Sequence, residues 1–109
     1  MPDTLKEDAP SSPKPWVRPK EVDSPRQRWT QIDVLHPGDA NKWAVAIGTW
    51  DKSIRLAVRW NGTDDNALGA PQARGNPTWL IVDEDFEKAI LSVVPAEKRA
   101  LANTLLGRT

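Results

Sequence analysis

Residues 43–60, with the sequence WAVAIGTWDKSIRLAVRW, carry the pattern that decides the fold. Apolar residues alternate with small or polar ones in two runs, 43–50 and 54–60, and this alternation predicts two β-strands. Few residues separate the runs, so the two strands are expected to form an antiparallel hairpin. The first run alternates large side chains with Ala44, Ala46 and Gly48, which predicts that a helix approaches the sheet closely on this small-residue face.

The second run predicts which strand residues face water. Its large apolar side chains are expected to point into the core, and these are Ile54, Leu56, Val58 and Trp60. Arg55 and Arg59 would then share the outward face with Ala57. The two arginines make this outward face a possible binding surface.

Further strands and helices are predicted on both sides of the hairpin. Residues 28–35 form a β-branched and aromatic run that ends at a turn signal, and residues 78–83, apolar on both faces, indicate a central strand. Acidic capping residues begin a helix over about 84–93, and Pro95 begins a second helix that ends at Gly107. Strands followed by helices predict an α+β fold, an antiparallel sheet of about four strands with two C-terminal helices packed on one face.

The first 27 residues differ in composition from the rest. They contain six of the ten prolines and few large apolar groups, too little to offset the entropy of ordering the backbone. We therefore predict a disordered, proline-rich, charged tail over residues 1–27 and a single domain over residues 28–109. Residues 13–19, PKPWVRP, can form a polyproline II segment that lies along a partner's groove or back across its own domain.

Composition excludes several classes of function. Fifteen basic and fifteen acidic side chains cancel, so no net charge attracts the chain to nucleic acid or anionic lipid. The chain has no cysteine, which excludes disulfides, thiolate catalysis and cysteine-ligated zinc. No run is apolar enough to cross a bilayer, and the N-terminal residues lack the apolar core of a secretory signal, so a cytoplasmic location is expected.

Catalytic and metal-binding patterns are weak. The single histidine, His36, stands in a turn, where an exposed or capping role is favoured over that of a general base. Asp64-Asp65-Asn66 resembles the start of a calcium loop, but the fifth and twelfth positions of such a loop hold leucine and glycine. The glycines of the same segment lack the lysine and the following helix of a phosphate-binding loop. These patterns disfavour an enzyme and predict no cofactor or metal.

The six tryptophans, with no tyrosine and one phenylalanine, form a skewed aromatic set. Most of them are expected to fill the small core, and these are Trp29, Trp43, Trp60 and Trp79. Tryptophan is also enriched at the centres of interfaces. Trp50 beside the hairpin turn or Trp16 in the tail is therefore the expected docking residue.

The polar segment 61–77, NGTDDNALGAPQARGNP, connects two apolar strands, and a rigid sheet can hold such an irregular loop in place for recognition. We therefore predict a non-catalytic protein-interaction module, such as a small accessory, inhibitor or immunity-type protein. It would bind a protein partner, or a second copy of itself, through this loop and the adjacent strand face. The predicted partner-binding residues are Arg55, Arg59, Trp50, Asp64, Asp65 and Arg74.

Two other functions stay open on the sequence. Arginines interleaved with tryptophans on a sheet can bind single-stranded nucleic acid by stacking and phosphate contact, although the balanced charge counts against it. The arginines concerned are Arg55, Arg59 and Arg74. A small enzyme would instead need carboxylates and an arginine that meet in one site, and the spacing of these residues in the sequence does not require them to meet. Its groups would come from Asp51, Asp64, Asp65 and Arg74.

Overall fold

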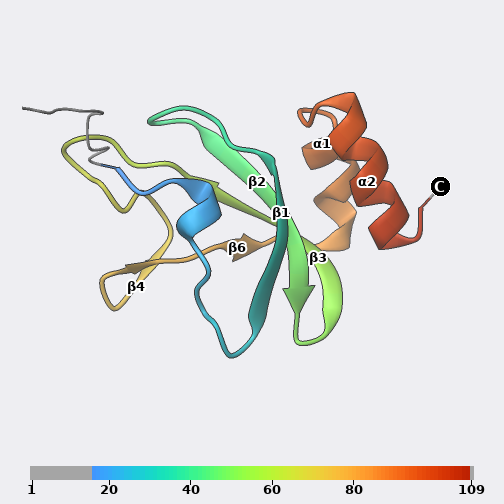
Figure 1. Ribbon diagram of the computed structural model, residues 1–109, viewed down its shortest axis with the longest axis horizontal. Coiled ribbons are helices and arrows are strands. Elements are labelled where there is room, and N and C mark those ends of the chain that lie inside the picture. The colour runs from blue at the N-terminus through green and yellow to red at the C-terminus, as the bar shows by residue number, and fades with distance from the viewer. Residues whose placement is uncertain (1–15, 109) are drawn as a thin grey trace, which may run out of the picture.

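A computed structural model describes residues 16–108 of the chain (Figure 1). The elements in order are η1 (Pro19–Glu21), β1 (Trp29–His36), β2 (Trp43–Trp50), β3 (Ser53–Trp60), β4 (Gln72–Ala73), β5 (Asn76–Pro77), β6 (Leu80–Ile81), η2 (Glu84–Phe86), α1 (Glu87–Leu91) and α2 (Ala96–Leu106). A four-stranded antiparallel sheet has the order β1-β2-β3-β6, and β4 and β5 pair as a separate small hairpin. Both helices lie on one face of the sheet (Figure 1), which confirms the predicted α+β fold.

The β2–β3 hairpin is in full register from Trp43 opposite Trp60 to Trp50 opposite Ser53. Its turn consists of Asp51 and Lys52, with φ of 49° and 73°. Positive φ at both central residues is what a two-residue turn of type I′ requires, and this turn matches the twist of the strands. The register places Trp43 and Trp60 at one end of the sheet and Trp50 at the other.

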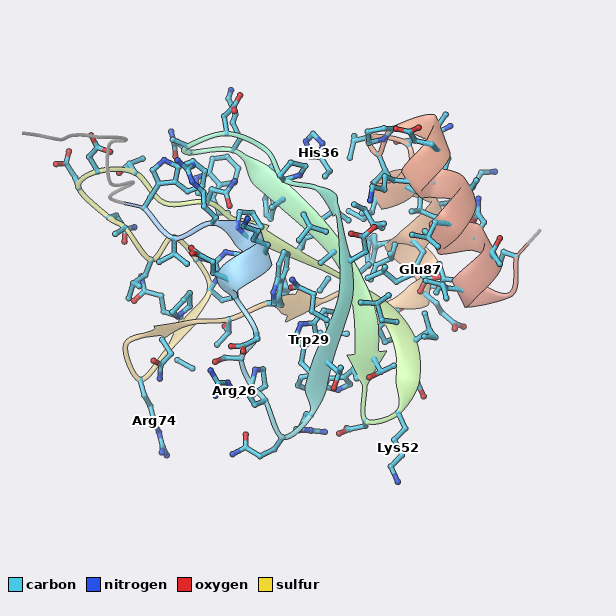
Figure 2. All side chains as sticks on the ribbon, in the orientation of Figure 1. Arg26, Trp29, His36, Lys52, Arg74 and Glu87 are labelled. Carbon is cyan, nitrogen blue, oxygen red and sulfur yellow. The ribbon has the colours of Figure 1, made fainter. Side chains whose placement is uncertain are left out.

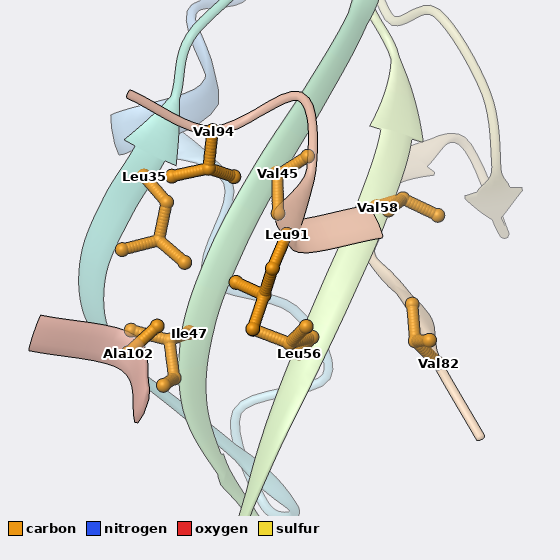
Figure 3. Packing of buried hydrophobic residues seen from close by; sticks show 9 residues of the cluster. All are labelled: Leu35, Val45, Ile47, Leu56, Val58, Val82, Leu91, Val94 and Ala102. Atoms are coloured by element: carbon orange, nitrogen blue, oxygen red, sulfur yellow. The ribbon is translucent and has the colours of Figure 1, made fainter. Parts of the chain in front are cut away.

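The first hydrophobic cluster lies between the sheet and the two helices (Figure 3). Its buried members are Leu35, Val45, Ile47, Leu56, Val58, Val82, Leu91, Val94 and Ala102. The helices therefore pack on the large side chains of β2. The prediction that a helix covers the small-residue face of this strand is wrong.

Two tryptophans cover the small-residue face instead. The second cluster joins Trp29 and Trp79, whose ring centroids are 6.4 Å apart, to small side chains of β2 and β3. At Gly48, a Cβ atom would lie 2.8 Å from the indole of Trp29 and 2.3 Å from the carbonyl oxygen of Thr30. Small residues are needed here because an indole ring occupies the space that larger side chains would fill.

A segment that the sequence places in the tail also packs on this face. Val22 belongs to the second cluster, and the indole N–H of Trp79 donates to the Val22 carbonyl oxygen at 2.5 Å. The N–H of Val17 donates to the carbonyl oxygen of Ala67 at 2.9 Å, and Trp16 is buried. The few apolar groups of the segment are thus enough to hold it against the sheet, since the tryptophan layer offers apolar surface to cover.

Part of the chain before the boundary predicted at residue 28 is therefore packed on the domain, since Trp16 and Val22 are buried. Of the two alternatives for the segment 13–19, its described part lies back across its own domain. Trp16 itself is covered by the guanidinium of Arg18, 3.5 Å from the ring centroid. Residues 1–15 of the predicted tail lie outside the described residues.

The predicted central strand over residues 78–83 is reduced to the short β6 at the edge of the sheet. Leu80 in this edge strand is 57% exposed. The second predicted helix ends as expected at Gly107, which has a φ of 76°. Neither described helix has the length and apolar content needed to cross a membrane.

Candidate binding surface

The predicted outward face of β3 is internal, because Arg59 is 0% exposed. Its Nη1 donates to the carbonyl oxygen of Thr78 at 2.5 Å, and its Nη2 donates to the carbonyl oxygen of Leu68. Within residues 16–108 the guanidinium makes no ion pair, and burial lowers the pKa of Arg59 below its usual value. An arginine keeps its charge at neutral pH even so. The prediction that Arg59 faces water is wrong, and the side chain instead ties the loop 61–77 to the sheet.

The loop 61–77 is attached to the sheet at further points. Trp60 and Ala70 exchange two backbone hydrogen bonds of 2.7 and 2.9 Å. The buried side chain of Asn61 donates through Nδ2 to two carbonyl oxygens of the β1–β2 connection, at 2.8 and 3.0 Å. The loop is therefore fixed by hydrogen bonds both to β3 and to the β1–β2 connection.

The other predicted partner-binding residues do not form one surface. Asp64 and Asp65 are exposed in the loop that leaves the Trp60 end of the sheet. Arg74 projects from the tip of the β4–β5 hairpin (Figure 2). Trp50 and Arg55 belong to the turn end of the β2–β3 hairpin.

The groups considered for an enzyme are also apart. Asp51 lies at the hairpin turn and forms an ion pair with Arg28, whose hydrogen bond lowers the pKa of Asp51. The same guanidinium lies 4.5 Å above the ring of Trp50. Asp64 is at the other end of the sheet, and Figure 2 shows His36 far from the hairpin turn. Among residues 16–108, no group of three histidine, aspartate or glutamate side chains is placed to hold a metal ion.

The burial of Arg59 removes one of the three arginines from the surface that the sequence suggested for nucleic acid. The Nη1 of Arg55 lies 4.0 Å from Oε2 of Glu84, so this cation has an acidic neighbour. Arg74 is on a separate hairpin. The described sheet face therefore lacks the row of free arginines that stacking and phosphate contact require.

The structure instead exposes two tryptophans that the sequence places in the core. Trp43 is 52% exposed and Trp60 is 36% exposed. Their rings form an edge-to-face pair with centroids 5.0 Å apart and an interplanar angle of 87°. The indole N–H of Trp60 donates to Oδ1 of Asn41 at 2.7 Å, which fixes the pair. Both residues are on the helix-covered face of the sheet, but the helices end before they reach this end of the strands.

An apolar groove of about 340 Å³ lies beside Trp43, between the sheet and α1. It is lined by His36, Trp43, Val45, Val58, Ala89, Ile90 and Val93. Val93, just after α1, is 59% exposed and continues the apolar surface outward. We call Trp43, Trp60 and this groove the aromatic end. The sequence carries no signal for it, because the apolar stripe of the helix predicted over about 84–93 does not show how far along the strands that helix lies.

A larger pocket of about 640 Å³ between α1 and α2 has a structural explanation. The buried carboxylate of Glu87 forms an ion pair with Arg108, across the pocket from its own helix. Arg99 donates through Nε to the carbonyl oxygen of Leu91 and through Nη2 to that of Val94, at 3.0 and 2.9 Å. These charges cap α1 and join the two helices, so they are already used by the fold.

Comparisons with known proteins add nothing to this geometry. No protein-family model matches the chain, and no match is found among curated proteins or among solved structures. The surface chemistry of the molecule therefore carries the functional inference.

Proposed function

We propose that this protein is a non-catalytic protein-interaction module that binds a protein partner through the aromatic end. The supporting observation is the exposed Trp43–Trp60 pair beside an apolar groove. Large exposed apolar groups that gather in one place mark interaction sites, and tryptophan is enriched among residues that dominate binding energy. This proposal keeps the predicted class of function but replaces the β3 face by the aromatic end.

Hydrogen bonds hold the Trp60 side of the aromatic end in place. Asn41 holds the indole of Trp60, and Arg59 and Asn61 hold the loop that follows it. Asp64 and Asp65 are exposed in the loop that follows Trp60, and we expect them to supply a polar rim to the apolar centre. A preformed surface loses little conformational entropy on binding, which leaves more of the contact energy for affinity.

The proposal includes a cytoplasmic location. The chain contains no cysteine, whereas small domains of the extracellular space commonly depend on disulfides. Fractionation of cells that express the full chain at its natural level tests this location.

Replacing Trp43 by alanine is expected to weaken partner binding by roughly thirtyfold, because truncating a central tryptophan at an interface costs about 2 kcal/mol or more. The immobilised full chain would capture the partner, mass spectrometry would identify it, and calorimetry would give the Kd for the purified pair. Ile32→Ala is the matched control, since Ile32 is also exposed but lies on β1. Equal Kd values for Trp43→Ala and the unchanged chain would contradict the proposal.

A further inference from the structure

The aromatic end holds an exposed side chain and a recess next to each other. The indole of Trp43 lines the groove and is still 52% exposed, so it forms a rim of the recess. The groove of about 340 Å³ is near the lower limit of about 300 Å³ for pockets that take a small molecule. It therefore has room for one aromatic side chain.

A surface of this kind is complementary to itself. In a dimer with a two-fold axis the same patch faces itself, and each contact from one copy to the other is made a second time in reverse. Trp43 of each copy can then fill the groove of the other copy. Both binding elements of such a dimer are already present on every chain.

Charge does not oppose this contact. A charged patch that faces its own copy brings like charges together, which costs free energy. No aspartate, glutamate, lysine or arginine lines the groove. The exposed charges that precede Trp43 have opposite signs, Asp39 and Lys42. The whole chain has zero net charge, so two copies do not repel each other at long range.

The exposed apolar surface is large enough for a weak dimer. Leu80 extends it, since Leu80 pairs with Val58 of the groove and is 57% exposed. Leu80, the two tryptophans and Val93 together give roughly 400 Å² per copy, given that one aromatic side chain buries about 150–250 Å². Two such patches with the usual polar rim bury about 1,200 Å² in total, the lower limit for a specific interface. We therefore expect a dimer that dissociates on dilution.

The edges of the sheet are poorer routes to a dimer. β1 has register shifts between Gln31 and Asp33 and between Val34 and His36, and such bulges twist an edge away from a further strand. β6, at the other edge, has only two residues. The aromatic end is therefore the favoured surface among the residues that the structure describes.

We propose that the free protein forms a two-fold symmetric dimer in which Trp43 of each copy fills the groove of the other. The inference deepens the proposed function by naming a second copy as the occupant, and it rests on that function only in taking the aromatic end as a binding surface. A different protein partner would have to displace the second copy. Its apparent affinity would therefore fall as the dimeric fraction of the chain rises.

Sedimentation equilibrium of the full chain tests the dimer. The average mass should rise with concentration from that of one chain towards twice that value. Trp43→Ala should raise the dissociation constant of the dimer by roughly a thousandfold, because a loss of about thirtyfold at one contact occurs twice in each dimer. Ile32→Ala removes exposed apolar surface of β1 and is the matched control, which should leave the constant unchanged.

A mixture of two kinds of chain locates the contact. The chain has no cysteine, so unenriched protein with a nitroxide spin label on Lys42→Cys can be mixed with isotope-labelled protein. The amide peaks of Ile90 and Val93 should lose intensity, because Lys42 directly precedes Trp43 and both residues line the groove. Lys52→Cys is the control label, since Lys52 lies at the opposite end of the hairpin (Figure 2).

Three results would overturn the inference. One is a chain that stays monomeric at every concentration. Another is a dimer whose dissociation constant is the same for Trp43→Ala and for the unchanged chain. The third is intensity loss in β1 instead of at Ile90 and Val93, which would assign the contact to the edge of the sheet. A monomeric chain whose partner binding still depends on Trp43 would leave the proposed function in place, so the two can fail separately.

Discussion

Replacing Arg59 by alanine is expected to lower the free energy of unfolding by about 3 kcal/mol. The change removes the donors for two carbonyl oxygens, of Leu68 and Thr78, and an unsatisfied buried acceptor costs about 1–3 kcal/mol. It also leaves a cavity, which adds to the loss. Among residues 16–108 the buried Arg59 has no carboxylate partner, so the removal of its charge offsets part of both losses. Urea denaturation of the Arg59→Ala variant and of the unchanged chain measures the difference in the free energy of unfolding.

Two further variants separate the donors from the volume. Arg59→Met keeps the aliphatic stem and removes the donors. Its free energy of unfolding should therefore lie between those of the alanine variant and the unchanged chain. Arg74→Ala removes an exposed arginine of the same loop and should change stability by less than about 0.5 kcal/mol. Equal stabilities of Arg59→Ala and Arg74→Ala would contradict the internal position of Arg59.

Replacing Gly48 by alanine is expected to destabilise the protein by about 3 kcal/mol, at the upper end of the usual cost of overpacking. The new Cβ would lie 2.3 Å from the backbone oxygen of Thr30 and 2.8 Å from the ring of Trp29. Backbone cannot give way as a flexible side chain does, so β1 must move away from β2. Thermal unfolding followed by tryptophan fluorescence reports both the loss of stability and the change around Trp29.

Gly75→Ala is the matched control for this experiment. Gly75 has a φ of 78° and nothing within 4 Å of its Cβ position, so alanine there adds only the left-handed strain of about 1–2 kcal/mol. A Gly48→Ala variant that is more stable than Gly75→Ala would mean that Trp29 does not lie against β2.

The periodicity of the chain predicts the elements of this fold well. Alternation over residues 43–60 gives the hairpin, and the order of strands and helices gives the α+β class. Alternation also groups Arg55 and Arg59 correctly on one side of β3. It cannot show what covers that side, because the cover comes from distant parts of the chain. The hydrogen bond from Trp79 to Val22 spans 57 residues, and nothing local to β3 encodes it.

The same limit explains the exposed tryptophans. The pattern correctly groups Trp43 and Trp60 with the large apolar side chains of the hairpin, and in the structure the helices cover that face. How far the cover extends along a strand depends on the length and position of the helices. Because α1 has only five residues, it does not cover Trp43 and Trp60 at the end of the hairpin. The proposed binding surface therefore lies where the hairpin extends beyond the helix that covers it.

Chemical-shift mapping of the isotope-labelled full chain with its purified partner tests the central claim most directly. We expect the largest changes at the indole N–H groups of Trp43 and Trp60 and at the backbone amide of Val93, with the backbone amides of Ala57 and Arg59 unchanged. Largest changes around Trp50 and Arg55, with the Trp43 indole unmoved, would contradict it.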